Sequence, residues 1–191
     1  SYDGSTTATL GTSNILYTGL VNGDDFSGSY TGSFNNANVA SGKTVTISST
    51  YSGDDVSNYS VTDQSSTTAN ITARTLTVSG LTASNKTYDA TTSATLDTSN
   101  VSYAGLVSGD SFSGSYTGAF NNSNVGTSKL VTISSSYSGD DINNYSITDQ
   151  SSTGADITKA SPTISGFSAQ SKYSDENYTL AGVPSISGLS I

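Results

Sequence analysis

The sequence contains no His and no Cys, which removes the side chains most often used for catalysis at neutral pH. Adjacent carboxylates do occur, at Asp24-Asp25, Asp54-Asp55 and Asp140-Asp141. A glycosidase needs a protonated carboxyl group and a second carboxylate on opposite sides of the bond that it cleaves. Neighbouring aspartates in Gly-rich turns are instead typical of side chains that accept backbone N–H groups. We therefore expect no catalytic residues and no enzymatic activity.

Calcium binding is a second chemistry that these acidic turns could support. Calcium takes several oxygen ligands, which carboxylates and turn carbonyls would supply if two turns lay at one end of a folded unit. No EF-hand loop or nonapeptide calcium repeat is present, and turn capping is the competing role. The candidate calcium ligands are Asp24, Asp54, Asp55, Asp110, Asp140 and Asp141. No other cofactor is expected.

Tyrosine rings offer a third possibility, because aromatic faces can stack on sugars in a carbohydrate-binding module. Ten of the 12 tyrosines recur in pairs spaced by 86 residues: 2/88, 17/103, 30/116, 51/137 and 59/145. Such recurrence favours a scaffold role, in which each ring is buried and each hydroxyl is hydrogen-bonded. Tyr59 and Tyr145, which both follow Asn, are candidates for a tyrosine corner.

A long internal repeat organises all of these residues. Residues 2–72, the first copy, return as residues 88–158, the second copy, without insertion or deletion, and 21 of the 71 paired positions differ. A period of this kind predicts a tandem array. We expect one repeat at 1–73, a second at 74–159, and the start of a third, divergent repeat at 160–191.

The pattern within one repeat predicts β-strands, because no apolar stripe of helical period occurs and short alternating runs are separated by turn residues. About seven short strands favour an all-β fold of tandem immunoglobulin-like β-sandwich modules arranged end to end. The sequence Asn22-Gly23 predicts a tight hairpin. In the first copy the expected strands are Tyr17–Val21, Asp24–Tyr30, Val45–Ile47, Tyr59–Thr62 and Ala69–Thr72.

The two copies differ in what precedes them. Alternating Leu76 and Val78 predict a strand ahead of the second copy, and Thr163–Phe167 repeats that pattern, but the first copy has no counterpart. One interpretation is that this chain, which lacks Met and a signal peptide, is a piece of a longer protein. The other is donor-strand complementation, in which the C-terminal segment fills the open edge of another molecule and builds a filament.

The charge limits the partners. Six basic and fifteen acidic residues give a net charge of −9, which excludes the phosphate contacts of a nucleic-acid-binding protein. No run of 18 apolar residues occurs, so we expect no membrane insertion. The expected partners are neighbouring repeats of the same parent chain and other copies reached by head-to-tail self-association through 160–191.

The repeat resembles the bacterial YDG/MBG ("mostly bacterial Ig-like") family. The resemblance rests on Tyr2-Asp3-Gly4 and, in the second copy, on these strings: Lys86-Thr87-Tyr88-Asp89, Gly105-Leu106-Val107-Ser108-Gly109-Asp110, Ser138-Gly139-Asp140-Asp141 and Asn144-Tyr145-Ser146-Ile147-Thr148. Family members occur in tandem in large surface adhesins and filamentous-haemagglutinin-type exoproteins. The resemblance therefore implies a secreted or bacterial cell-surface location and an extracellular stalk or spacer role without enzymatic activity.

Overall fold

The computed structural model describes residues 1–169, 186 and 187, and these residues form a nearly all-β structure with several sheets. The helices of this part of the chain are two single 3-10 turns, η1 (Val56–Asn58) and η2 (Ile142–Asn144). The prediction of an all-β fold is therefore confirmed for the secondary structure of the described residues.

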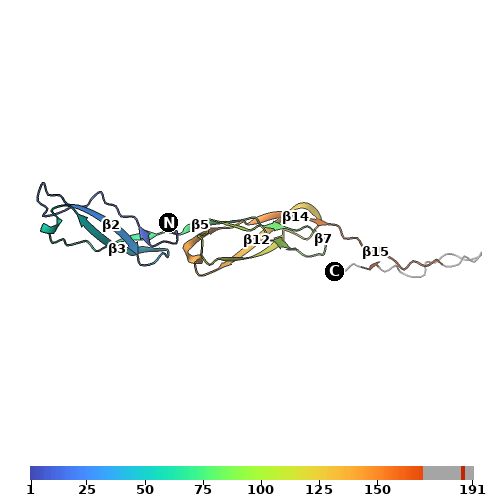
Figure 1. Ribbon diagram of the computed structural model, residues 1–191. Coiled ribbons are helices and arrows are strands. Elements are labelled where there is room, and N and C mark those ends of the chain that lie inside the picture. The colour runs from blue at the N-terminus through green and yellow to red at the C-terminus, as the bar shows by residue number, and fades with distance from the viewer. Residues whose placement is uncertain (170–185, 188–191) are drawn as a thin grey trace, which may run out of the picture. The chain divides into compact units, whose positions relative to one another are not determined.

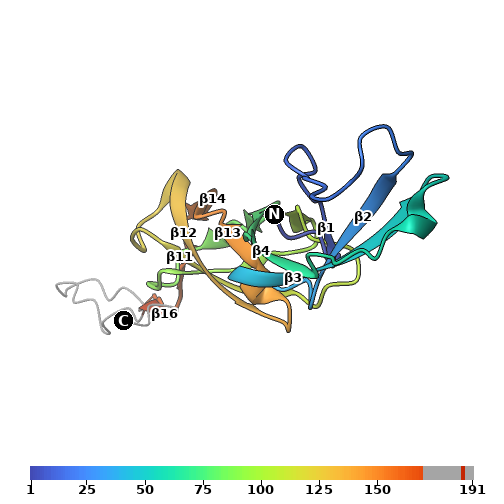
Figure 2. The same ribbon diagram turned by 90° about the vertical axis from the view of Figure 1, so that its left-hand side faces the viewer.

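The first copy forms one antiparallel sheet of four strands in sequence order: β1 (Thr7–Ala8), β2 (Ser27–Phe34), β3 (Ala40–Ser52) and β4 (Ser66–Ile71). β2 and β3 are paired along the whole of β2, and they are the long neighbouring strands in Figures 1 and 2. The prediction at Val45–Ile47 is confirmed by β3, and that at Ala69–Thr72 is confirmed by β4 as far as Ile71. The predicted strand Asp24–Tyr30 is confirmed only from Ser27, where β2 begins.

The glycines of β2 allow close packing on one face of this sheet. Phe26, Tyr30 and Phe34 alternate with exposed residues, and Gly28 and Gly32 lie between them on the same face. A Cβ at Gly28 would lie 2.2 Å from the Tyr30 hydroxyl oxygen, and one at Gly32 would lie 2.9 Å from a backbone carbonyl oxygen. No side chain fits at either position without displacing a neighbour.

The second copy repeats the four strands at the same offset and adds one more, giving the order β7-β14-β12-β11-β8. The bounds are β7 (Lys86–Thr87), β8 (Ser93–Ala94), β11 (Ser113–Phe120), β12 (Gly126–Ser138) and β14 (Ser152–Thr158). β14 pairs antiparallel with β12 and parallel with β7.

The second copy also has strands that the first copy lacks. β5 (Arg74–Ser79) lies between β10 (Ser102–Ala104), with which it is antiparallel, and β13 (Tyr145–Thr148), with which it is parallel. Another short pair joins β6 (Thr82–Ala83) to β9 (Leu96–Asp97). The first-copy positions equivalent to β9, β10 and β13 are not strands. In the second copy these elements pair with β5 and β6, and the described residues contain no strand in the corresponding place of the first copy.

Two local predictions are therefore corrected. Tyr59–Thr62 is not a strand, although its equivalent β13 is, and Tyr17–Val21 does not form a hairpin with the following strand. The Asn22-Gly23 sequence lies in a turn in which the Asp24 N–H donates to the Val21 carbonyl oxygen and only Gly23, at φ 102°, has positive φ. A type I′ turn requires positive φ at both central residues, so the strand-closing turn does not form.

The described chain falls into two compact units. Unit 1 contains Ser1–Ser79, Val101–Ser115 and Ser136–Asp149, and unit 2 contains Gly80–Asn100, Tyr116–Ser135 and Gln150–Ile191. In unit 1 a buried cluster contains Tyr2, Ile71, Leu76 and Tyr145. In unit 2 the buried cluster contains Phe120, Val131, Ala155 and Ile157. The sequence-based division at residues 73 and 159 stays a prediction.

β15 (Thr163–Ile164) begins the expected third repeat and pairs with β16 (Ile186–Ser187). The prediction of a strand at Thr163–Phe167 is thus confirmed for its first two residues. The rest of the expected third repeat, residues 170–185 and 188–191, lies outside the described residues. Tyr173 and Tyr178 are among them.

Candidate functional site

Strand β5 is the central element of the second copy's inner core. Leu76 and Val78 are 0% and 2% exposed, and Leu81, just beyond the strand, is 1% exposed. Burying three such side chains contributes roughly 1.5–3 kcal/mol each relative to leaving them in water. The alternating pattern seen in the sequence therefore marks the strand that completes the second copy.

Two groups fix β5 and the residues after it in place. Gln150 holds Leu81 at two points: its Oε1 accepts the Leu81 N–H at 2.9 Å, and its Nε2 donates to the Leu81 carbonyl oxygen at 2.7 Å. Gly105, at φ 101°, lies so close to β5 that a Cβ there would be 2.4 Å from the Thr75 carbonyl oxygen. The space that β5 and Leu81 occupy is therefore shaped to their backbone as well as to their apolar side chains.

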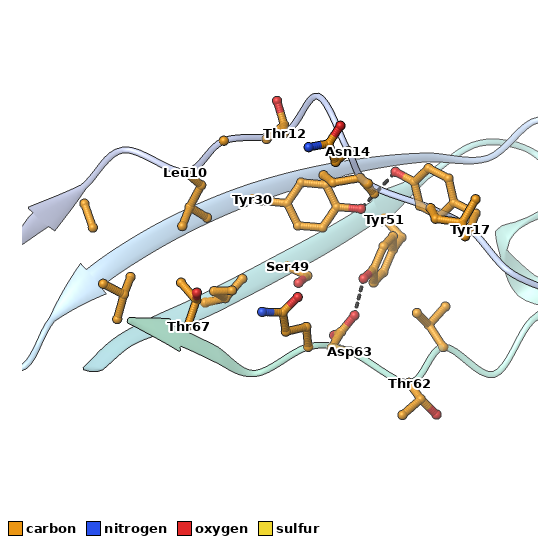
Figure 3. A pocket seen from close by; sticks show the side chains of 18 of the residues that line it. Leu10, Thr12, Asn14, Tyr17, Tyr30, Ser49, Tyr51, Thr62, Asp63 and Thr67 are labelled. Atoms are coloured by element: carbon orange, nitrogen blue, oxygen red, sulfur yellow. Dashed lines mark hydrogen bonds between the residues drawn. The ribbon is translucent and has the colours of Figure 1, made fainter. Parts of the chain in front are cut away.

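The first copy has an open groove at the place equivalent to the one that β5 occupies in the second copy. The groove has a volume of about 970 Å³ and is lined by residues 8–12, 14–18 and 20, by Phe26 and the inner face of β2 and β3, and by residues 59–64 and 67–70. Figure 3 shows Tyr30 and Tyr51 between the Thr12–Asn14 segment on one side and the Thr62–Asp63 segment on the other. The Tyr30 hydroxyl bonds that of Tyr17 at 2.8 Å, and the Tyr51 hydroxyl donates to Asp63.

Apolar side chains at the rim of this groove are exposed. Leu16 is 83% exposed, Val61 is 42% exposed and Ile15 is 40% exposed. In the second copy, Ile147 occupies the position of Val61 and packs against the buried core. A Cβ at Gly19, which corresponds to Gly105, would meet no atom of the described residues within 4 Å.

A joint connects the first copy to the second within unit 1. Tyr2 is 4% exposed, and its ring lies edge-on against Tyr145 with 5.6 Å between the ring centroids. The Tyr2 hydroxyl donates to the Asp110 carboxylate, 3.1 and 3.0 Å from its two oxygens, and the Tyr145 hydroxyl also donates to Asp110. Burial, followed by the bond to Asp110, raises the pKa of Tyr2 to about 12, and the same causes raise the pKa of Tyr145.

Asn144 and Arg74 add polar contacts to the joint. Asn144 is 4% exposed; its Oδ1 accepts the Val39 N–H at 3.0 Å, and its Nδ2 donates to Asn38 Oδ1 at 3.4 Å. Arg74 Nε donates to the Gly105 carbonyl oxygen at 2.7 Å. Only Thr72 and Ala73 separate β4 from β5, so one copy ends almost where the completing strand of the next begins.

The first copy has the same hydrogen bonds at the positions equivalent to Tyr145, Asp110 and Val107. Tyr59 Oη donates to Asp24 at 2.6 Å and accepts the Val21 N–H at 2.9 Å, as Tyr145 does with Asp110 and Val107. The bond to Asp24 is the main cause of the raised pKa of Tyr59. Asn58, the equivalent of buried Asn144, is exposed.

Tyr59 and Tyr145 are hydrogen-bonded as a scaffold role requires, but they are not tyrosine corners. A corner hydroxyl bonds backbone only a few residues upstream. Here each hydroxyl bonds a backbone N–H 38 residues upstream. The tyrosine-corner prediction was therefore wrong, because these hydroxyls tie the 3-10 turn to a distant turn instead.

Four of the six aspartates proposed as calcium ligands, Asp24, Asp55, Asp110 and Asp141, accept hydrogen bonds through their carboxylates. Asp55 Oδ2 accepts the Asp25 N–H at 2.8 Å, and Asp141 Oδ2 accepts the Ser111 N–H at 2.8 Å. Asp24 and Asp110 accept tyrosine hydroxyls, and the Asp54 N–H donates to Asp25 at 3.3 Å. In the described part of the chain no three His, Cys, Asp or Glu residues form a group that could hold a metal ion. Calcium binding at Asp24, Asp54, Asp55, Asp110, Asp140 or Asp141 stays a prediction.

The family of the chain follows from comparison with known proteins. The model of the YDG domain family matches residues 1–69 and 72–154, so the chain belongs to this family. No curated protein and no solved structure matches the chain. Within residues 1–169, 186 and 187, no helix is both long and apolar enough to cross a membrane.

Proposed function

We propose that this chain is a non-catalytic extracellular stalk or spacer of a bacterial cell-surface adhesin. In this proposal each YDG repeat is an immunoglobulin-like β-sandwich module, and successive modules are arranged end to end. The observation that carries the proposal is the joint between the copies: a two-residue connection from β4 to β5, closed by bonds from Tyr2 and Val39 to Asp110 and Asn144.

A spacer needs a joint that resists bending, and the chemistry of this joint supports such a role. A flexible linker is rich in Gly and Ser and makes few contacts. Here the connection is Thr72-Ala73, and apolar residues of both copies share one buried cluster. β12 is 13 residues long, and at about 3.3 Å per residue a strand of that length spans roughly 40 Å. Each added repeat would extend the reach of the parent protein by a similar distance.

Distance measurements between two spin labels test the stiffness of the joint. Because the chain has no Cys, Ser48→Cys and Ser134→Cys would provide the only labelling sites, at equivalent exposed positions of the two copies. We expect a single narrow distance distribution that calcium leaves unchanged and that broadens when Tyr2→Ala and Asn144→Ala remove the joint contacts. A broad distribution in the parent chain would contradict the spacer role, and narrowing by calcium would favour the calcium-binding alternative.

A further inference from the structure

The pair Asn22-Gly23 combines a side-chain amide with a following residue that has no side chain. Asn22 is the one asparagine of the sequence that precedes a glycine. The glycine matters because it has no Cβ, so its backbone nitrogen can approach the amide carbon of the preceding side chain. Since the pair does not close a hairpin, its chemistry can be considered apart from any role in joining strands.

The turn that contains this pair leaves both groups free to react. Asn22 and Gly23 are exposed, and an added Cβ at Gly23 would meet no atom beyond its chain neighbours within 4 Å. Among the described residues, no hydrogen bond engages the Asn22 side chain or the peptide group that joins it to Gly23. The turn is closed by one long bond, from the Asp24 N–H to the Val21 carbonyl oxygen at 3.3 Å. The peptide group can therefore rotate until its nitrogen faces the side chain.

We propose that Asn22 is a site of spontaneous deamidation, at which the folded chain converts this asparagine to isoaspartate and aspartate. The Gly23 nitrogen loses its proton and attacks Cγ of Asn22, and the Cγ–Nδ2 bond breaks as ammonia leaves. Water then opens the resulting five-membered imide at either carbonyl, which gives isoaspartate or aspartate. Water is the sole co-reactant, and the inference does not depend on the spacer role.

The second copy shows that this exposure does not depend on what is packed beside the turn. The equivalent pair, Ser108-Gly109, lies next to the complete joint, where Asp110 accepts a tyrosine hydroxyl. Its turn is the same: the Asp110 N–H donates to a carbonyl oxygen three residues earlier at 3.2 Å, and Gly109 has φ 96°. Ser108 and Gly109 are nevertheless exposed. A module packed in the same way against the first copy would leave Asn22 exposed as well.

Other asparagines lack this freedom. Asn122, which precedes the small residue Ser123, is the nearest competitor in sequence. Its Oδ1 accepts Lys129 Nζ at 2.7 Å and the Asn124 N–H at 3.0 Å. These two bonds hold the amide in place, and the side chain of Ser123 hinders its nitrogen. We therefore expect Asn22 to react before any other asparagine.

The reaction would alter the bonds that hold Tyr59. The Tyr59 hydroxyl oxygen accepts the Val21 N–H at 2.9 Å and donates to Asp24 at 2.6 Å, so its two partners lie on either side of the reacting pair. Isoaspartate adds a methylene group to the main chain between them, and either product adds one negative charge to the net charge of −9. The longer backbone of isoaspartate should displace one partner from the hydroxyl.

Peptide mapping of the folded chain during incubation in mildly alkaline buffer tests the proposal. Alkaline pH favours the reaction because the attacking nitrogen must lose its proton. We expect isoaspartate and aspartate to accumulate at Asn22 first, with release of an equivalent amount of ammonia. Gly23→Ala should slow the conversion by at least about tenfold, because its Cβ hinders the nitrogen. An Asn22 that stays intact in the folded chain but is converted in urea would overturn the proposal, since the fold would then protect it.

The second copy supplies matched variants. Asn22→Ser introduces the residue of the second copy and should abolish conversion in the first copy. Ser108→Asn creates the reactive pair in the equivalent turn, beside the complete joint, and should be converted as well. Conversion of Asn22 without conversion at this new site would overturn the assignment of the reactivity to the shared turn.

Hydrogen exchange measures the consequence for Tyr59. In the isoaspartate product the Val21 N–H should exchange at least about threefold faster than in the fresh chain, because its bond to the Tyr59 hydroxyl is weakened. Asn22→Asp adds the charge without the methylene group and should leave this exchange rate unchanged. Equal exchange in the product and the fresh chain would contradict the displacement, and faster exchange in Asn22→Asp would assign it to charge and not to backbone length.

Discussion

At the residue scale, Tyr2 is buried in the joint whereas the ring of its equivalent Tyr88 is exposed, which makes each copy a control for the other at this position. Tyr2 and Tyr88 occupy equivalent positions, and among the described residues it is the Tyr2 hydroxyl that bonds a carboxylate of the following copy. Substituting each tyrosine in turn and comparing the two losses of stability therefore measures what the joint contributes, separately from what a tyrosine contributes at this position.

We expect Tyr2→Phe to lower the free energy of unfolding by about 1.5–3 kcal/mol, because it removes a hydroxyl bonded to a partly buried carboxylate. Tyr88→Phe, at an exposed ring, should change it by less than about 0.5 kcal/mol. Urea denaturation of both variants measures the difference. Equal effects would show that the Asp110 bond contributes no stability.

The same bond predicts a dependence on alkaline pH. The pKa of Tyr2 is raised from its ordinary value of 10.0 to about 12, so the folded state holds this proton more tightly than the unfolded chain does. The stabilisation is complete below pH 10 and is lost as the pH rises towards 12. The stability deficit of Tyr2→Phe should therefore shrink over this interval in urea denaturation series. A deficit that stays constant would contradict the assignment.

At the scale of elements, the sequence predicted the strands of long alternating pattern but not those that depend on a distant partner. Alternating residues predicted β5 and parts of β2 and β3, because the expected strand Asp24–Tyr30 overlaps β2 only from Ser27 and Val45–Ile47 covers only the middle of β3. Tyr59–Thr62 and Tyr145–Thr148 are nearly identical in sequence, yet only the second is a strand. Their difference lies in the presence of β5, so no local pattern could distinguish them.

The joint was also only partly predictable. The recurrence of tyrosines indicated a scaffold, but nothing in the sequence showed that Tyr2 and Asp110, 108 residues apart, would meet. Asn144 and Gln150 were missed, because Asn and Gln are common in this chain and carry no signal of burial. The sole available hint was that the same residue types stand 86 positions earlier, as Asn58 and Gln64.

Gly105 and Gly19 provide a prediction about elements. Both have positive φ, 101° and 89°, so alanine strains the backbone at each. Only at Gly105 does the added Cβ also meet the backbone of β5. We expect Gly105→Ala to cost about 1–3 kcal/mol more than Gly19→Ala in thermal or urea unfolding. Equal costs would contradict the close approach of β5.

At the scale of the whole molecule, the two copies should differ in stability despite their similar sequences. The second copy contains β5 and buried Leu76, Val78 and Leu81, whereas the first copy has an open groove at that place. Less apolar surface is buried around the sheet of the first copy, so its local unfolding should be easier.

Hydrogen exchange measures this difference directly. Val45-Thr46-Ile47 and Val131-Thr132-Ile133 have the same sequence in equivalent strands, so their intrinsic exchange rates nearly cancel. We expect the amides of the first set to exchange at least about tenfold faster. Filling the groove with an internal copy of residues 73–86 should remove most of the difference. Equal protection in the parent chain would show that the missing strand has no effect on local stability.

The position of β5 also determines how the chain would bear tension. β5 follows β4 after two residues and is bonded to β13 on one side and β10 on the other. A pull along the chain would load these ladders in shear, so several hydrogen bonds must break together before the strand slides. Unfolding under force is governed by the barrier and not by equilibrium stability. The joint that connects two copies would therefore also be where the second copy resists extraction under load.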